Sequence, residues 1–449
     1  MEVRLLKSAS VLIAARGVKL LCDPWLVDGE YFGSWAHYPP YDFDVADFAD
    51  LDFIYISHIH PDHFSRKTLS LLPRHVPVLI HAYATPFLRT NIESLGFRVH
   101  ELPHRRRTHL KNGVHINILA ADNCDPALCG RFFGCAQVEK TFGSTQIDSL
   151  AVIDDGRYVV LNVNDCPFEL ARASLALVGE QYAAIDLLLT GYAGAGPWPQ
   201  CFPQLPRDER DRAAAAKKRQ FLEQAEAFVN TTKPKHYLPF AGTYTLAGKL
   251  ARLNAHRGVP ELDEARDFFR RAGSPIDPGR SRCVALAAGA RLDLAGGDCG
   301  EQYVPVDRAA KARYIDEVLA ARPLDYEACR PPDMAELKAL APQAYQRLER
   351  RRRQLGFHSP TKVYISLGDA LAARLSLAGE GIDFVAEESA EEEERFVLFR
   401  ADPRLLLWLL KGPRFAHWNN AEIGSHLELE RRPNTFERGL YHLMCWFHE

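Results

Sequence analysis

The sequence predicts a mixed α/β (α+β) protein, with a mainly antiparallel sandwich of strands in residues 1–300 and a smaller α+β module in residues 301–449. In the first part, short apolar runs alternate with turn signals such as DDGR, which is typical of strands. The chain has 449 residues and 47% hydrophobic content, enough for a large core and two or three domains. The stretch LAGGDCGEQYVPVD, residues 294–307, marks the boundary because helical patterns follow it.

The predicted strands of the first part are short apolar runs with β-branched and aromatic residues. They lie near residues 3–6, 10–14, 18–22, 51–57, 77–81, 113–120, 149–154 and 157–163. The Gly/Pro-rich stretch GAGPWPQCFPQLP, residues 194–206, predicts a loop inside this domain and near its site. A helix is expected directly after it, over Arg207 to Asn230.

The second part predicts helices over 308–321 and 334–355. Its last 90 or so residues follow the order strand 362–367, helix, strand 382–387, strand 395–400, helix 402–411, strand 427–430 and helix 436–447. Residues 389–395, SAEEEER, are expected in a hairpin tip or surface loop. The order of elements resembles a sterol-carrier-like α+β module, although no fixed motif carries that resemblance.

Composition narrows the function classes. A formal net charge of -3 argues against a general electrostatic affinity for nucleic acid. The ten cysteines are irregularly spaced, unlike the framework of a small secreted scaffold. The first residues include Glu2, Arg4 and only a short apolar run, which predicts neither a signal peptide nor a membrane span. We expect a cytoplasmic protein with free thiols.

One segment, YISHIHPDHF at residues 55–64, concentrates side chains that can bind a metal. It follows a predicted strand and carries His58, His60, Asp62 and His63. Alternate residues of such a loop, His58 and His60, can face one metal, and the turn that starts at Pro61 can bring Asp62 and His63 to a second point nearby. Imidazole nitrogen and carboxylate oxygen are ligands of zinc, iron and manganese, so the ligand types leave the metal open.

The pattern His58-x-His60-x-Asp62-His63, with Asp23 upstream in LLCDPWL, closely resembles the motif of the metallo-β-lactamase superfamily. This resemblance implies an αββα sandwich with the metal site along one edge of the two sheets. It also implies that Asp165, at the end of the strand YVVLNVND, is a metal-bridging carboxylate. In the segment KPKHYLPFAGTY, Phe240 stands where hydrolytic members supply their last metal-binding histidine.

Within the superfamily, the segments DPWL, YISHIHPDHFS, NVNDC, PFAG and HWNN are most similar to the catalytic region of the cytidine monophosphate-N-acetylneuraminate hydroxylases. That resemblance implies an iron-dependent monooxygenase, a class in which a Rieske iron–sulfur domain precedes the sandwich. This chain begins directly with the predicted sandwich and lacks the pair of Cys-x-His and Cys-x-x-His segments that holds a Rieske cluster. If the chain is an oxygenase, we expect its electrons to come from a separate donor protein.

The third histidine of the first metal site is a further departure from the family pattern. Ser144 or Gln146 falls at that place, and the possible replacements nearby are Asp122, Asp125, His104 and His109. A site of His58, His60, His63 and Asp165, with Asp62 as ligand or base, can still hold one or two metal ions.

The favoured function is an iron-dependent oxygenase that acts on a small anionic metabolite, because two histidines and a carboxylate leave positions open for oxygen and substrate. The alternative is a zinc- or manganese-dependent hydrolase of a phosphodiester, lactone or amide, in which Asp62 orients or deprotonates the water. Because Phe240 stands in place of the last metal-binding histidine of hydrolytic members, it modestly favours the oxygenase over the hydrolase, and its apolar side chain is a candidate wall of the substrate site. A binding protein that has lost the chemistry is the third possibility.

Three further segments have both a functional and a structural interpretation. Arg105, Arg106 and Arg107 in HRRRTH can hold a substrate phosphate or carboxylate, or form a solvated turn. Cys124, Cys129, Cys135 and Cys166 are interpreted as buried thiols rather than cluster ligands, because their spacing fits no standard run. The segment FAHWNNAEIGSH, with His417, Trp418, Asn419 and His426, can reach over the site but is predicted to be structural.

Overall fold

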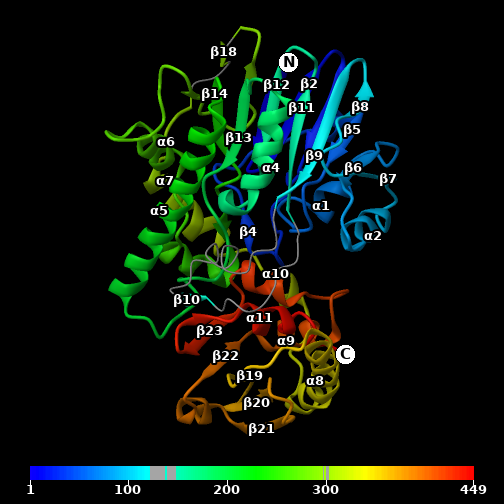
Figure 1. The fold of residues 1–449 in the computed structure, drawn as a ribbon. Helices are drawn as coiled ribbons and strands as arrows, with labels where there is room; N and C mark the ends of the chain where they lie inside the picture. Colours follow the sequence, from blue (N-terminus) through cyan, green and yellow to red (C-terminus); the bar gives the residue numbers. More distant parts are fainter. Residues whose placement is uncertain (122–136, 139–147, 297, 300–302) are drawn as a thin grey trace.

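The structure is a computed structural model that describes residues 1–121, 137–138, 148–296, 298–299 and 303–449. Two large sheets pack face to face (Figure 1). The first has the order β18 (Asp298–Cys299), β17 (Arg291–Asp293), β1 (Glu2–Lys7), β2 (Ser10–Ala15), β3 (Val18–Cys22), β5 (Phe53–Tyr55), β6 (Val78–His81) and β7 (Val99–Leu102). The second has the order β16 (Arg282–Cys283), β14 (His236–Phe240), β13 (Leu187–Gly191), β12 (Val159–Asn162), β11 (Ser149–Asp154), β9 (Val114–Ala120) and β8 (Thr108–Lys111).

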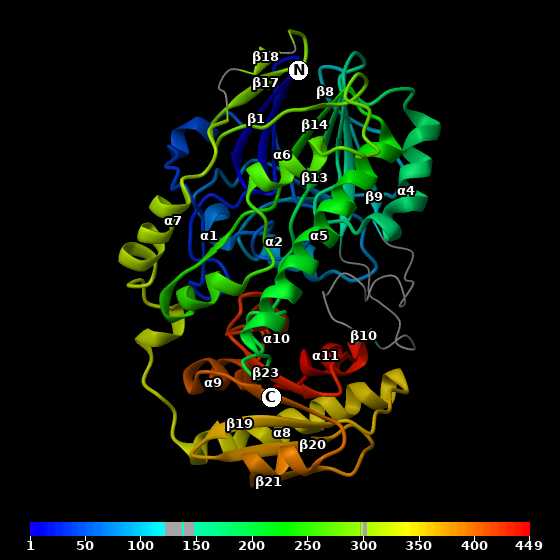
Figure 2. The same cartoon turned by 90° about the vertical axis from the view of Figure 1, so that its left-hand side faces the viewer.

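Helices cover the outer faces of both sheets, which gives the four layers of the predicted αββα sandwich. One apolar cluster lies between the sheets and includes Val11, Leu79, Ile153 and Leu189. A second lies under α1 (Arg66–Leu69) and α2 (Phe87–Glu93) on the first sheet. A third lies under α4 (Phe168–Gln181), α5 (Arg207–Thr232) and α6 (Leu262–Arg270) on the second sheet. Figure 2 shows α4, α5 and α6 together on one side of the sandwich.

The first sheet has four antiparallel and three parallel pairs of neighbouring strands, and the second has three of each, so the sandwich is mixed rather than mainly antiparallel as predicted. Strands β1, β2 and β3 are joined by tight turns and pair antiparallel. From β3 to β7, and from β12 to β16, the neighbouring strands are parallel. Parallel neighbours need a long crossover connection. The helices α4 and α5 lie in two of these connections.

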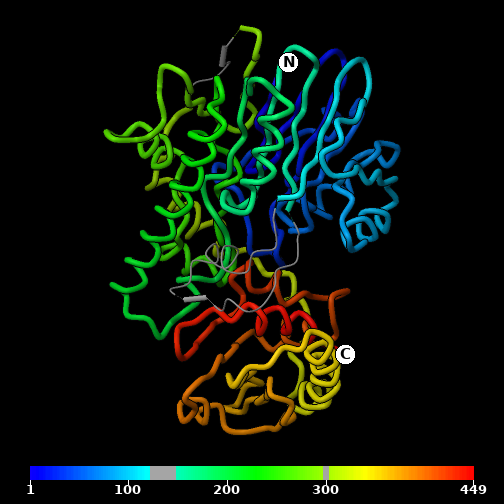
Figure 3. The backbone as a smooth tube through the Cα atoms, in the orientation of Figure 1, coloured from blue at the N-terminus to red at the C-terminus, as the bar shows by residue number. Residues whose placement is uncertain are grey.

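The C-terminal module is a five-stranded sheet with helices on one side. Its order is β21 (Ile382–Ala386), β20 (Leu371–Ser376), β19 (Lys362–Gly368), β22 (Phe396–Arg400) and β23 (Glu428–Arg432). The apolar cluster of the module includes α8 (Met334–Leu355), α9 (Pro403–Lys411), α10 (Trp418–Ile423) and α11 (Arg438–Met444). In Figure 3 the N-terminus lies at the end of the sandwich away from this module, and the C-terminus lies within the module. The backbone carbonyl of Glu449 accepts a hydrogen bond from Arg347 of α8.

One helix predicted for the module is absent from the described residues, because the segment after β19 is the strand β20. Gly368, Asp369 and Ala370 all have positive φ angles, of 96°, 49° and 56°. Such a turn closes a β-hairpin, and it overrides the helix propensity of the alanines and leucines that follow. The acidic segment is a 3-10 helix, η6 (Glu387–Glu392), rather than the tip of a hairpin.

Several short elements lie between the sandwich and the module. The strand β4 (Trp35–Ala36) pairs with β15 (Thr245–Leu246), and β10 (Gln137–Val138) pairs with β24 (Thr435–Phe436). The connection to the module contains α7 (Arg308–Tyr314), the π-helix η4 (Ile315–Leu319) and η5 (Asp325–Ala328). Ion pairs join this connection to the sandwich, including Lys311 to Glu261 and Arg322 to Asp28. Two 3-10 helices, η1 (Val45–Phe48) and η3 (Gly248–His256), complete the sandwich connections. Within the part of the chain that the structure describes, no helix combines the length and apolarity that a membrane crossing requires.

Candidate metal centre

The loop after β5 carries the histidine motif at one edge of the first sheet. Because β3 and β5 are parallel neighbours, their carboxyl ends lie at the same edge, which brings Asp23 beside Ser57 and the histidines. Both carboxylate oxygens of Asp23 are used there. The Ser57 backbone N–H donates to Oδ1 at 2.7 Å, and the Ser57 hydroxyl donates to Oδ2 at 2.8 Å. Asp23 has a φ of 43°, an unusual angle for a residue with a side chain.

Asp23 also orients His63. Its Oδ2 lies 2.9 Å from His63 Nδ1, which places the proton of a neutral ring on Nδ1 and leaves Nε2 to face a metal. A carboxylate that holds the far nitrogen of a histidine in this way is the usual support of a metal ligand. The upstream Asp23 of the predicted motif therefore positions a ligand and does not belong to either candidate metal group.

Two groups of side chains among the described residues could each hold a metal ion. The first is His58, His60 and Asp148, and the second is His58, His63 and Asp165; within each group the ligand atoms lie within 4.8 Å of one another. His58 Nε2 is 2.9 Å from His60 Nδ1 and 3.6 Å from Asp148 Oδ1. His63 Nε2 is 3.4 Å from Asp165 Oδ2. The structure thus brings together His58, His60, His63 and Asp165.

Asp62 lies beside the second group. Its Oδ2 is 3.6 Å from His63 Nε2, and its Oδ1 accepts a hydrogen bond of 2.5 Å from the Tyr31 hydroxyl. Nothing in the sequence pattern indicated Tyr31, because it lies in a loop far upstream of the motif. Asp148 was also missed, although it stands directly before the strand 149–154 at the same sheet edge. The resemblance that indicated Asp165 gave no signal for Asp148, because Asp148 precedes its strand instead of following it.

Burial controls the charges of these groups. It lowers the pKa of His58, and neighbouring His63 and His60 lower it further. It also lowers the pKa of His60. For His63, burial acts in the same direction, but the carboxylates of Asp165, Asp62 and Asp23 outweigh it and raise the pKa well above its usual value. Burial raises the pKa of Asp62. His58 and His60 are therefore neutral near pH 7, the state in which imidazole binds metals.

A cavity of about 270 Å³ opens on the metal centre. The sandwich contributes Tyr31, His60, Asp62, Asp148 and Asp165, together with residues of the loop after β13. The predicted loop 194–206 therefore lies at the site, with Gly194 to Trp198 in the cavity wall. Asn164, Pro167, Leu170, Phe221 and Gln224 of the sandwich also line it. The C-terminal module contributes Asn419, Glu422, Ile423, Leu429, Arg431, Phe436, Arg438 and Tyr441.

The C-terminal module contacts the metal ligands as well as the cavity. Asn419, in α10, lines the cavity together with His60, and its side chain acts to raise the pKa of His60. The ring of His426 lies with Nε2 2.7 Å from the backbone carbonyl of Tyr31, whose hydroxyl donates to Asp62. Asn419 of the segment FAHWNN therefore reaches the cavity, whereas Trp418 packs in the core of the module and His426 supports the loop that holds Tyr31.

The arginines predicted to bind substrate do not line this cavity. Arg105 forms an ion pair of 2.7 Å with Glu180, and Arg106 is exposed. Arg107 binds both oxygens of Asp154, at 2.9 and 2.6 Å. Phe240 ends β14 and is buried between the two sheets, and it is also absent from the described lining.

Some predicted candidates lie outside the described residues: Asp122, Cys124, Asp125, Cys129, Cys135, Ser144 and Gln146. His104 and His109 are described, and neither belongs to a candidate metal group. The cysteines whose side chains the structure describes are all free thiols, namely Cys22, Cys166, Cys201, Cys283, Cys329 and Cys445. The cytoplasmic location stays a prediction.

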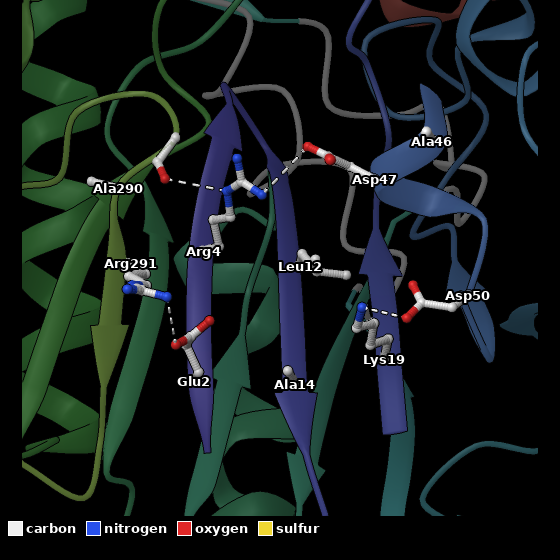
Figure 4. A pocket seen from close by; sticks show the side chains of 11 residues that line it. Glu2, Arg4, Leu12, Ala14, Lys19, Ala46, Asp47, Asp50, Ala290 and Arg291 are labelled. Carbon is white, nitrogen blue, oxygen red and sulfur yellow. Dashed lines mark hydrogen bonds and ion pairs between the residues drawn. The ribbon is translucent and has the colours of Figure 1, made fainter. Parts of the chain in front are cut away.

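A second hollow lies on the outer face of β1, β2 and β3 (Figure 4). Its charged side chains pair with one another: Arg4 with Asp47 at 3.8 Å, Lys19 with Asp50 at 2.6 Å and Arg291 with Glu2 at 3.7 Å. Since these charges balance, the hollow presents no concentrated charge to a ligand.

The fold and the histidine motif can be compared with known proteins. Residues 2–120 match the family model of the beta-lactamase superfamily domain, in agreement with the resemblance that the motif carries. Two kinds of curated relative are similar to the chain. A protein of Mycobacterium tuberculosis named as a Rieske 2Fe-2S iron–sulfur protein is 27% identical over 297 residues, which cover 62% of this chain and 53% of the relative.

The second kind is the hydroxylase already indicated by the short motifs. The cytidine monophosphate-N-acetylneuraminic acid hydroxylase of Asterias rubens is 27% identical over 238 residues, which cover 51% of this chain and 32% of the hydroxylase. The chain thus spans about half or less of the length of these curated relatives.

Solved structures with a related fold include both hydroxylases and hydrolases. A mutant form of the β-hydroxylase CmlA is 19% identical with a TM-score of 0.43, and the match covers 65% of this chain and 53% of CmlA. An isothiocyanate hydrolase from Delia radicum gut bacteria is 15% identical with a TM-score of 0.38, and the match covers 65% and 98%. Likenesses of this size do not distinguish the two reactions.

Proposed function

We propose that the chain is an iron-dependent oxygenase that acts on a small anionic metabolite. The observation that carries the proposal is the donor set of His58, His60 and Asp148, whose ligand atoms lie within 4.8 Å of one another. Two neutral imidazoles and one carboxylate form the set that non-haem iron oxygenases use, and they leave coordination positions open.

His58, His63 and Asp165 would form a second metal position, with Asp62 beside it. His63 Nε2 lies 3.4 Å from Asp165 and 3.6 Å from Asp62, and Asp23 fixes its ring. The two positions together have three carboxylates and three imidazoles as ligands. This ligand set fits iron better than a pair of zinc ions, which would each have a full set of histidines. The absence of a histidine at Phe240 points the same way.

Bound iron would supply one-electron chemistry with oxygen. The residues of the chain orient the carboxylates and form the wall of the cavity. The Tyr31 hydroxyl donates a hydrogen bond to Asp62 and so fixes that carboxylate relative to His63. The cavity wall contains Leu170, Trp198, Phe202 and Phe221. Apolar walls of this kind exclude competing water from a reactive centre. A volume of about 270 Å³ is just below the usual range of ligand pockets, about 300–1,000 Å³, which favours a small substrate.

The names of the curated relatives support oxidation, since one is named as a Rieske protein and the other as a hydroxylase. In this chain, the segment Cys445 to His448 has the Cys-x-x-His spacing, but no Cys-x-His segment accompanies it. We therefore propose that electrons come from a donor other than these 449 residues.

Metal analysis and oxygen uptake test the proposal together. Protein purified without chelators is expected to contain iron, and with a chemical reductant it should consume oxygen faster when its substrate is present. Changing both His58 and His60 to Ala should abolish metal binding, and changing Asp148 to Asn should reduce it, with little loss of folding. His75→Ala, at an exposed histidine, is the matched control.

Efficient cleavage of phosphodiester or lactone reporters by the zinc-loaded protein, without oxygen uptake under any reductant, would favour the hydrolase instead. Retention of full metal content in the double variant would overturn the ligand assignment.

A further inference from the structure

One carboxyl group of the C-terminal module faces the cavity without belonging to the metal centre. Glu422, in α10, lines the cavity and is part of neither candidate metal group. The other carboxylates of the described lining, Asp62, Asp148 and Asp165, lie on the sandwich side. The position of Glu422 therefore requires an explanation of its own.

The contacts of the Glu422 carboxyl differ from those of a structural carboxylate. Among the residues that the structure describes, none donates a hydrogen bond to this carboxyl or forms an ion pair with it. Glu437, a buried carboxylate of the same module, accepts hydrogen bonds from the hydroxyls of Ser359 and Thr361. It also pairs with Arg395 at 3.2 Å. Because buried polar groups normally have such partners, Glu422 retains its acceptor capacity for a group that enters the cavity.

Removal from water makes this carboxyl costly for the protein. Burial raises the pKa of Glu422 to about 7, although Arg431 acts to lower it. Burial and, to a lesser extent, Glu422 raise the pKa of the Cys445 thiol to about 12, so the thiol is neutral near pH 7 and adds no charge. A carboxyl without hydrogen bonds costs free energy in such a place. A ligand that donates a hydrogen bond would recover that free energy.

We propose that Glu422 accepts a hydrogen bond from the substrate, which carries an amine or a hydroxyl at this point. The aromatic side chains of the same lining, Trp198, Phe202 and Phe221, contact the apolar part of the substrate next to that group. This inference rests on the proposed function, because it adds a donor group to the anionic substrate assigned there. A carboxyl accepts hydrogen bonds from both kinds of donor, and a charged pair with an ammonium is the stronger.

Three probes of the same shape test the site directly. They are 2-phenylethylamine, 2-phenylethanol and 2-phenylethyl fluoride, of which the fluoride has no N–H or O–H to donate. Binding is measured by calorimetry on full-length, metal-loaded protein without oxygen, so that the metal occupies the aspartates of the sandwich wall. We expect at least one of the two donor probes to bind at least about tenfold more tightly than the fluoride, the ratio given by one hydrogen bond to a charged group.

Two variants separate the charge of Glu422 from its acceptor oxygens. Glu422→Leu should weaken binding of the preferred donor probe by about tenfold or more and leave the fluoride unaffected. Glu422→Gln keeps an acceptor oxygen, so it should weaken the amine far more than the alcohol. Glu388→Gln is the matched control, since Glu388 is exposed and absent from the described lining. Melting curves and metal content establish that each variant is folded and loaded; if Glu422→Leu does not fold, Glu422→Gln and the wild-type probe series carry the test.

The preferred probe tells an amine substrate from a hydroxyl substrate. Failure of both donor probes to bind the wild-type protein more tightly than the fluoride would overturn the inference, as would equal binding by the Glu422 and Glu388 variants. Binding that depends on Glu422, in a protein without any oxygen uptake, would retain the donor site and reject only the oxygenase.

Discussion

At the scale of single residues, one buried carboxylate organises much of the metal centre. Asp23 binds the backbone and hydroxyl of Ser57 and the Nδ1 of His63. The Ser57 hydroxyl in turn lies 2.9 Å from His58 Nδ1. The rings of two candidate ligands are therefore oriented through contacts that do not touch the metal.

Asp23→Asn tests this support. The amide keeps the size of the side chain but loses the charge that stabilises the Nδ1 proton of His63. We expect iron affinity to fall by about tenfold to a hundredfold, the usual effect of removing a group that orients a metal ligand. Competition with a chelator of known affinity measures the change, and Asp50→Asn, at an exposed surface carboxylate, should have no effect.

A second buried carboxyl predicts a dependence of stability on pH. Glu30 accepts a 2.5 Å hydrogen bond from the Ser65 hydroxyl, and burial raises its pKa from 4.5 to about 7. Because the folded state favours the neutral form, the stability it contributes is fully present below pH 4.5 and is lost as the pH rises through about 7.

Glu30→Gln should therefore remove this dependence, since the amide does not ionise. Relative to the variant, the wild-type free energy of unfolding is expected to fall by up to about 3 kcal/mol between pH 5 and pH 8. Urea unfolding of chelator-treated protein at both pH values measures the difference. Parallel pH profiles for the two proteins would contradict the assignment.

Only some residues of the site could be predicted from the sequence. His58, His60, Asp62 and His63 are adjacent along the chain, so their spacing alone predicts that they meet. Asp148 and Tyr31 reach the site through strand order and loop packing, which a single sequence does not display. The predicted role of the arginines 105–107 stays a prediction, although their described contacts lie away from the cavity.

At the scale of elements, helix α5 fixes the cavity loop that follows β13. Lys217 is buried in α5, and its Nζ donates to the backbone carbonyls of Ala195 and Trp198 at 2.9 and 2.8 Å. Gly194 lies so close to the Phe221 ring that an added Cβ would come within 1.9 Å of it. The segment from Gly194 to Trp198 is thus held against α5.

Lys217→Met removes the donors and keeps the side-chain length. We expect the free energy of unfolding to fall by about 2–3 kcal/mol, because buried carbonyls lose a charged partner. Amide exchange in residues 194–202 should speed up as well. Lys218→Met is the control, since Lys218 is half-buried and reaches only Glu264 at 3.3 Å. Unchanged exchange in the loop would show that other contacts hold it.

Element prediction succeeded where the local pattern and the tertiary structure agree. The helix over 334–355 is observed with those bounds as α8, with Asp333 as its N-cap and Gly356 in the left-handed conformation at its end. The helix predicted for the segment of β20 is wrong, because the turn before β20 and its pairing with β19 and β21 decide the conformation. The parallel halves of the sheets depend on crossovers that strand patterns do not record.

At the scale of the whole molecule, the sandwich and the C-terminal module share one apolar cluster. It joins Trp25 and Trp35 of the sandwich loops to Leu375, Leu409 and Trp418 of the module. Side chains that interlock in this way lose their packing together when either part unfolds.

We expect the two parts to unfold in a single transition. Pulsed hydrogen exchange with mass spectrometry follows peptides from β11 and β12 in the sandwich and from β19 and β20 in the module. Protection in both sets should be lost at the same urea concentration. Two separated midpoints would show that the shared cluster does not couple the parts.

The two walls of the cavity come from different parts of the chain. The groups of the candidate metal centre lie in the sandwich, whereas the opposite wall includes side chains of the module between Asn419 and Tyr441. Sequence changes in the part of the module that lines the cavity, Asn419 to Tyr441, would alter which metabolite binds without changing the metal ligands. Exchange of that segment between relatives is thus an evolutionary route to new substrates, provided that the Asn419 and His426 contacts survive the exchange.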